Sequence, residues 1–130
     1  MRVAVIICGA NSERGIIMER AVELYSGKWL DQVIQFSACT VAASPLILGM
    51  SGVRMDRVIS VNGCRNCCTD IILKRSDITP YRSVIIDDII DRPISKCESC
   101  TSFIFPDITE EESIGVAVAI ERAINETLAD

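Results

Sequence analysis

Short runs of β-branched and apolar residues recur along this chain, with room for a helix between most of them. Four such runs predict strands because they are brief and rich in Val and Ile. They are residues 2–7 (RVAVII), 32–38 (QVIQFSA), 57–61 (RVISV) and 82–86 (RSVII). Turn-forming residues, such as the Asn62–Gly63 pair after the third run, mark where these strands end.

Apolar residues between the first runs recur at helical spacing. After a loop at 8–12, where Asn11 or Ser12 is a candidate N-cap, two adjoining rows predict a helix that ends at Gly27. The two rows are Ile17, Ala21, Leu24 and Met18, Val22, Tyr25. Ser44 and Pro45 suit the N-cap and first position of another helix, which continues into LILGM at 46–50.

The second half of the chain predicts two more helices. Residues 68–75 (CTDIILKR) form a helical segment with Cys68, Ile71 and Ile72 on one side. Thr109 and Glu112 match a capping box, which starts a final helix over about 110–128. That helix packs Ala117, Ile120, Ile124 and Leu128. The segment 91–108 is the least regular part of the chain.

This alternation of strands and helices predicts the fold class. Strands that alternate with helices favour a parallel sheet with right-handed crossovers and helices on its faces. We therefore expect a single-domain, three-layer α/β fold with a mainly parallel four-stranded sheet, Rossmann-like or flavodoxin-like, over residues 1–130. A chain of 130 residues is long enough for one domain with its own core.

Composition narrows the classes of function. The formal net charge is -5 and no long basic stripe is present, which disfavours contact with nucleic-acid phosphates or an anionic membrane surface. No apolar run approaches the ~20 residues that span a bilayer, and the first residues indicate a strand rather than a signal peptide. We expect a cytoplasmic protein whose apolar content allows a homodimer without requiring one.

Cysteine is the residue type that most changes this picture. The chain has seven cysteines and no histidine. Disulfide scaffolds occur mainly in small secreted domains, whereas a cysteine-dense intracellular chain more often uses its thiols for metal binding, redox chemistry or nucleophilic catalysis.

Three cysteines follow three successive predicted strands. Cys8 follows the first strand, Cys39 the second and Cys64 the third. The carboxyl ends of parallel strands share one edge of the sheet, where doubly wound folds bind their ligands. We therefore expect these three thiols to converge there.

The segment VNGCRNCCTD, residues 61–70, adds further thiols. If a helix starts near Cys64, then Cys64 and Cys68 lie one turn apart on one face. Cys8, Cys39, Cys64 and Cys68 then form a set of four thiolates, which favours tetrahedral zinc. Cys67 lies nearby, and the Cys97/Cys100 pair is a second half-site, a redox pair, a substitute for one of the four ligands, or two loop thiols.

These motifs resemble the DGC domain family, whose members are regarded as zinc binding because of four shared cysteines. The matching features are CGA after the first strand, a cysteine after the second, and NGCRNCC before a helix, over roughly residues 3–90. The family's four cysteines fall on Cys8, Cys39, Cys64 and Cys68. Asn62 replaces the motif's Asp, which keeps the turn geometry and removes a negative charge. The resemblance implies zinc binding but no defined catalytic activity.

Other functions fit the same residues. Cys8 and Arg14 have the CX5R spacing of low-molecular-weight cysteine phosphatases and arsenate reductases, in which loop N–H groups and an arginine bind an oxyanion. Gly15, where that motif usually has a hydroxyl residue, and the lack of an Asp-Pro general acid argue against this enzyme class. A four-cysteine site also suits an iron–sulfur cluster, and Cys64/Cys68 or Cys97/Cys100 suit a thiol redox protein.

Overall fold

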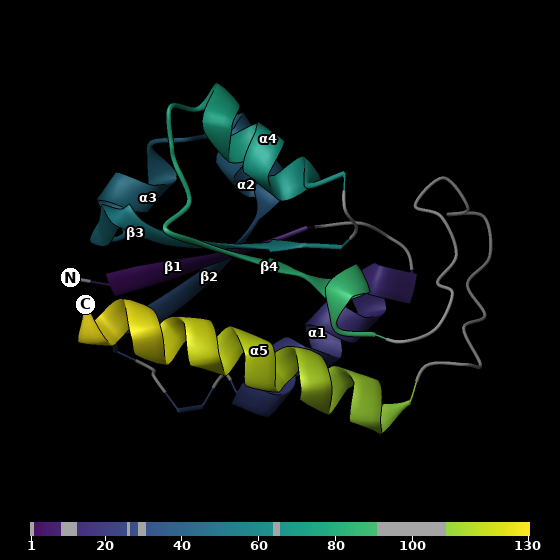
Figure 1. The fold of residues 1–130 in the computed structure, drawn as a ribbon. Helices are drawn as coiled ribbons and strands as arrows, with labels where there is room; N and C mark the ends of the chain where they lie inside the picture. The colour runs from purple at the N-terminus through teal and green to yellow at the C-terminus, as the bar shows by residue number, and fades with distance from the viewer. Residues whose placement is uncertain (1, 9–12, 26, 29–30, 64–65, 91–108) are drawn as a thin grey trace.

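The protein is an α/β fold in which a four-stranded sheet lies between two layers of helices (Figure 1). The structure, a computed structural model, describes residues 2–8, 13–25, 27–28, 31–63, 66–90 and 109–130. Its elements are β1 (Arg2–Ile7), α1 (Glu13–Tyr25), β2 (Val33–Ser37), α2 (Ala38–Ala43), α3 (Ile47–Met50), β3 (Val53–Asn62), α4 (Cys68–Arg75), β4 (Arg82–Ile85), the 3-10 turn η1 (Ile86–Asp88) and α5 (Glu110–Ala129).

All four strands are parallel, and their order is β2-β1-β3-β4. This is the order of the first four strands of a flavodoxin-like sheet, so the predicted fold class is confirmed. The chain leaves β1 in one direction to reach β2 and crosses back past β1 to reach β3. The strand order therefore reverses between β1 and β3, and such a switch point is where open α/β sheets bind ligands.

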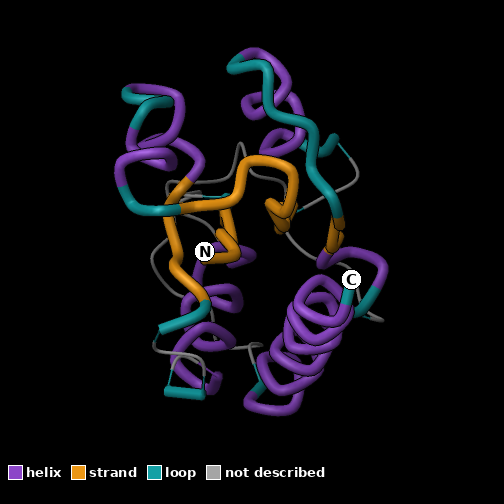
Figure 2. Tube along the Cα trace, turned by 90° about the vertical axis from the view of Figure 1, so that its left-hand side faces the viewer, coloured by secondary structure: helices purple, strands orange, loops and turns teal. Residues whose placement is uncertain are grey.

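The side chains of the sheet alternate between two apolar layers. In β1, Val3 and Val5 pack with α1 and α5, while Ala4 and Ile6 face the layer of α2, α3 and α4. A strand buried on both faces explains why RVAVII is continuously apolar. Figure 2 shows the helices of the two layers on opposite sides of the strands. The buried side chains of the α1–α5 layer include Ile17, Met18, Ala21 and Tyr25 of α1 and Ile120 and Ile124 of α5.

Two predicted boundaries between 32 and 50 are wrong. β2 ends at Ser37 because the Ser37 hydroxyl accepts the Thr40 N–H at 3.2 Å and caps α2, which begins at Ala38. Ser44 does not start the next helix. It closes α2, donating its N–H to the Thr40 carbonyl at 3.0 Å, and α3 begins only at Ile47. The alternation of apolar residues could not reveal these two caps.

β3 and β4 also differ from their predicted bounds. β3 spans residues 53–62 rather than 57–61, because Val53 pairs with Arg2 and residues 54–57 bulge opposite Val3 alone. Residues 54–57 are polar or exposed, so no apolar pattern marks this part of the strand. β4 stops at Ile85, and Ile86 opens η1 instead of ending the strand.

The last helix follows its prediction. Thr109 and Glu112 form the expected capping box: the Thr109 hydroxyl accepts the Glu112 N–H at 3.3 Å, and the Glu112 carboxylate accepts the Thr109 N–H at 2.9 Å. Leu128, predicted to pack, is 38% exposed. In the part of the chain that the structure describes, no helix is both long and apolar enough to cross a membrane.

Candidate functional site

The carboxyl ends of β1 and β3 lie side by side at the switch point. Ile7, the last residue of β1, pairs with Ser37 of β2 on one side and with Val61 of β3 on the other. Cys8 follows at once, and its N–H donates to the Val61 carbonyl at 3.2 Å. Cys8 therefore lies where it was predicted, after β1 at the carboxyl edge of the sheet, and it is bonded to β3.

The same Val61 carbonyl also holds the first turn of α4. The hydroxyl of Thr69, a fully buried residue, donates to it at 3.0 Å. Thr69 directly follows Cys68, the first residue of α4. One backbone oxygen thus anchors both Cys8 and the residue next to Cys68, although these segments are far apart in the sequence.

The start of α4 differs from its prediction. The helix begins at Cys68, not near Cys64, and Cys67 is its N-cap. Cys67 has left-handed backbone angles, φ 53° and ψ 48°, which a residue with a Cβ rarely adopts. Its side chain makes no capping hydrogen bond to the helix. The condition for placing Cys64 and Cys68 on one helical face, a helix that starts near Cys64, is therefore not met.

A residue from β3 supplies the missing cap. The Asn62 side-chain oxygen accepts the N–H of Asp70, at the third position of α4, at 3.2 Å. In return, the Asn62 amide donates to the Asp70 carboxylate at 3.2 Å. Asn62 is completely buried. The residue that replaces the Asp of the family motif is thus a tertiary cap for α4.

Two serines complete a polar cluster around the Asp70 carboxylate. Ser60 of β3 donates to it, and Ser83 of β4 donates at 3.2 Å to each oxygen. Ser60 and Ser83 are register partners, and their hydroxyl oxygens are 2.9 Å apart. We call Ser60, Asn62, Asp70 and Ser83 the β3–α4 clamp. Sequence reasoning missed it, although Ser60 and Ser83 were visible as polar residues inside apolar strand runs.

Cys39 approaches the same edge from the other side of β1. It is the second residue of α2, not the residue after a strand, and its side chain is exposed. α2 packs beside α4 in the same helical layer. Cys68 is exposed as well, and Cys67 is half-buried. On α4, Thr69 and Leu73 are buried, whereas the side that carries Cys68, Ile71 and Ile72 is only partly covered: Ile72 packs against the core and Ile71 is 47% exposed.

The described thiols reach the edge from both layers. Cys8 packs against the core of the α1–α5 layer, whereas Cys39 and Cys68 lie in the first turns of helices in the opposite layer. Among residues 2–8, 13–25, 27–28, 31–63, 66–90 and 109–130, no three Cys, Asp or Glu side chains are grouped closely enough to hold a metal ion. Cys64, Cys97 and Cys100 lie outside these ranges. Within the described ranges, the Val61 carbonyl links Cys8 to Thr69, the neighbour of Cys68.

The CX5R alternative shares the position of Cys8. Arg14 is the second residue of α1, so the arginine follows β1 and starts a helix, as that motif requires. Residues 9–12, which would form the anion-binding loop, lie outside the described residues. The phosphatase or arsenate reductase interpretation stays a prediction.

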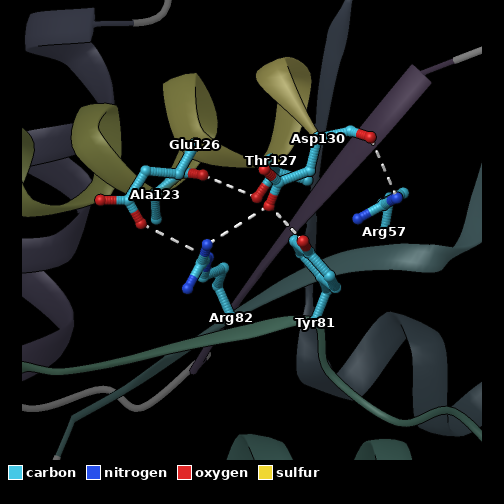
Figure 3. Close-up of polar contacts among 7 residues, drawn as sticks. All are labelled: Arg57, Tyr81, Arg82, Ala123, Glu126, Thr127 and Asp130. Atoms are coloured by element: carbon cyan, nitrogen blue, oxygen red, sulfur yellow. Dashed lines mark hydrogen bonds and ion pairs between the residues drawn. The ribbon is translucent and has the colours of Figure 1, made fainter.

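A second polar cluster lies at the amino edge, where β4 begins and α5 ends (Figure 3). The Asp130 carboxylate accepts from the Tyr81 hydroxyl and from Arg82 Nη2, the latter at 3.4 Å. Arg57 Nη2 donates to the Asp130 carbonyl at 3.3 Å, and its guanidinium lies 4.3 Å from the Tyr81 ring centre. Arg82 Nε is 3.4 Å from a Glu126 oxygen but is not aligned for a hydrogen bond. Cations here stabilise the C-terminus of α5.

The α1–α5 layer contains a groove of about 390 Å³ and an unusual tyrosine. The groove is lined by residues that include no cysteine: Arg20, Glu23, Leu24, Glu110 and Ser113. The Tyr25 hydroxyl is buried without a hydrogen-bond partner. Burial, helped by the negative charge of Glu121, raises the Tyr25 pKa far above its usual value. Because no cysteine lines the groove, we do not place the site there.

No family model, curated protein or solved structure matches this chain. The resemblance to the DGC domain family therefore rests on the cysteine motifs alone.

Proposed function

We propose that this protein binds zinc through Cys8, Cys39, Cys64 and Cys68 at the carboxyl edge of its parallel sheet. The observation that carries the proposal is the Val61 carbonyl, which accepts hydrogen bonds from both the Cys8 N–H and the Thr69 hydroxyl. This shared acceptor fixes two predicted ligand segments at the switch point of the sheet, where α/β folds bind ligands.

The chemistry of the donors supports a metal rather than an organic ligand. Thiolates are strong ligands for zinc, and the chain has no histidine to complete a mixed set. The N-terminus of α4 begins at Cys68, and its partial positive charge would offset part of the negative charge of a four-thiolate site. Four thiolates leave no open coordination position, so the bound ion ties the segments after β1, β2 and β3 together rather than activating a water.

Cys39 and Cys64 complete this set on the strength of the sequence. Cys39 lies in the first turn of α2, which packs beside α4, and Cys64 directly follows the buried Gly63 in the sequence, four residues before Cys68. We place the protein in the cytoplasm, where thiols stay reduced and able to bind metal.

Metal analysis of anaerobically purified protein tests the proposal. We expect near-stoichiometric zinc that falls sharply in Cys8→Ser, Cys39→Ser, Cys64→Ser and Cys68→Ser. Met50→Ser, at a residue of α3 that is 84% exposed, is the control and should keep its zinc. A brown protein with visible absorption and bound iron would instead support an iron–sulfur cluster.

The same protein samples discriminate against an enzyme without metal. Wild-type protein that contains no metal, and that hydrolyses an aryl phosphate or reduces arsenate until Cys8 is changed to Ser, would overturn the zinc proposal in favour of the CX5R alternative. Arg14→Ala is the matching variant, because the oxyanion interpretation needs that guanidinium and the zinc interpretation does not.

A further inference from the structure

The first turn of α4 is capped by a residue of β3 rather than by its own N-cap residue. The first N–H groups of a helix have no partner within the helix, and an N-cap side chain of Ser, Thr, Asp or Asn normally accepts one of them. Cys67 occupies the N-cap position and makes no such bond. The N–H of Asp70, which a local cap would take, is instead bonded to Asn62 of β3.

The side chain of Asp70 makes further hydrogen bonds to the sheet. Its carboxylate accepts from the Asn62 amide, from Ser60 and from Ser83, so that donors from two neighbouring strands meet on one group of α4. Ser60 and Asn62 are completely buried on the face of the sheet that carries α4. Charge-assisted hydrogen bonds of this kind are short, directional and about twice as strong as those between neutral groups.

These contacts fix the place of two thiols. Asp70 follows Cys68 by two residues and Cys67 by three, within one helical turn. β3, to which Asp70 is held, also carries the Val61 carbonyl that binds the Cys8 N–H. A cap supplied from β3 leaves the N-cap position of α4 available for a cysteine, and it sets that cysteine and its neighbour relative to Cys8.

We propose that Asp70 is the positioning residue of the carboxyl-edge thiols: it clamps the first turn of α4 to β3 and so holds Cys67 and Cys68 in place for the ligand. The functional part of this inference rests on the proposed zinc site. The contacts of the clamp do not involve the metal, so they can be tested separately in metal-free protein.

Zinc affinity, measured by competition with a chromophoric chelator, tests the functional part. Asp70→Ala leaves Ser60, Asn62 and Ser83 without their acceptor, and we expect zinc to bind about tenfold or more weakly, as for other residues that orient metal ligands. Asp70→Asn keeps one acceptor oxygen and should therefore retain most of the wild-type zinc affinity. Ser83→Ala removes a single donor and should show a smaller loss in the same direction, which keeps the test available if Asp70→Ala does not fold.

A matched control separates positioning from general stability. Thr127→Val removes a buried hydroxyl of α5 that donates to the Ala123 carbonyl at 2.6 Å, near the opposite edge of the sheet. Zinc affinity should not change in this variant. Affinity in Asp70→Ala within about twofold of wild type, well below the range for orienting residues, would overturn the proposal.

Amide hydrogen exchange in metal-free protein tests the clamp directly. The Ile71 N–H bonds to the Cys67 carbonyl at the start of α4, and the Ile78 N–H bonds to the Leu73 carbonyl at its end. Asp70→Ala should speed exchange at Ile71 about tenfold and leave Ile78 unchanged, because only the first turn is released. Unchanged exchange at Ile71 would overturn the clamp. Wild-type protein that binds no zinc would overturn the proposed function, while the exchange at Ile71 still decides the clamp.

Discussion

The two edges of the sheet hold their helices by different means. At the carboxyl edge, the β3–α4 clamp joins the first turn of α4 to two strands through one carboxylate and three donors, and its members Ser60 and Asn62 have no exposed surface. At the amino edge, Arg57, Tyr81 and Arg82 meet the end of α5 through side chains that are partly exposed, although Arg57 Nε and Arg82 Nε are buried (Figure 3). The side chains of Arg82 and Asp130 are 40% and 43% exposed.

This difference determines how much each contact stabilises the fold. A buried donor or acceptor that loses its partner keeps the full cost of its desolvation, whereas an exposed ion pair is replaced by water. The amino edge therefore tolerates change, and the carboxyl edge does not. The buried polar residues Ser60, Asn62 and Thr69 lie at the edge that carries Cys8 and Cys68, which is where we propose the metal site.

The largest expected effect is at Asn62. Asn62→Ala removes the cap of α4 and leaves the Asp70 N–H and carboxylate each short of a partner, so we expect a loss of about 2–3 kcal/mol in the free energy of unfolding. Urea unfolding of metal-free protein measures it. Tyr81→Phe, which removes one bond at the amino edge, is the comparison and should cost well under half as much. Equal losses in the two variants would show that the two edges do not differ in how strongly their polar contacts stabilise the fold.

The next largest effect has the opposite sign. Cys67 and Asp77 are the described residues other than glycine with positive φ, 53° and 57°, at the two ends of α4. Glycine adopts this conformation without strain, so we expect Cys67→Gly and Asp77→Gly each to stabilise the metal-free protein by about 1 kcal/mol. Thermal or urea unfolding checks this.

Zinc content then distinguishes these two variants. Asp77→Gly should keep its zinc, because Asp77 lies at the far end of α4 from the cysteines. The zinc content of Cys67→Gly shows whether Cys67 belongs to the ligand set, a question that the sequence leaves open. Destabilisation of metal-free Cys67→Gly would mean that the Cys67 side chain contributes more to the fold than its backbone strain costs.

A smaller effect is expected at Arg82. Arg82→Ala removes two contacts at 3.4 Å, to Glu126 and to Asp130, from side chains that are 40–46% exposed. Such pairs are worth about 0.2–1 kcal/mol, and we expect a loss in that range that shrinks at ~1 M salt because the charges are screened. Urea unfolding at low and high salt measures both. A loss as large as that of Asn62→Ala, independent of salt, would show that the amino edge is also a buried clamp.

The smallest effect at neutral pH is expected at Tyr25, a buried polar group without a partner. Tyr25→Phe should leave stability at pH 7 unchanged or slightly raised, because it loses no hydrogen bond and removes a buried hydroxyl whose desolvation is not offset. Burial raises the folded-state pKa of Tyr25, so the unfolded chain releases this proton first, and wild-type stability should fall as pH rises above about 10. Urea midpoints at pH 7 and in this alkaline range should show a flatter dependence for Tyr25→Phe. Identical slopes would mean that this hydroxyl does not resist ionisation.

Local patterns predicted the elements whose causes are local. The run RVAVII is buried on both faces and forms β1 with the predicted bounds, and the Thr109–Glu112 box starts α5 where expected. The end of β2 was missed because Ala38 continues the apolar pattern while the Ser37 hydroxyl caps a helix. The start of α4 was missed because its cap comes from Asn62, which no local pattern connects to Asp70.

By itself, the sequence determined the order of strands and helices, the parallel sheet and the position of Cys8 after β1, because periodicity and short-range capping depend only on neighbouring residues. Only the tertiary structure decided that the strained Cys67 directly precedes α4, that Asn62 caps this helix, and that the Val61 carbonyl joins Cys8 to the first turn of α4. Those contacts link residues far apart in the chain. Their energy comes from burying polar groups together, which becomes favourable only once the sheet has brought its strand ends to one edge.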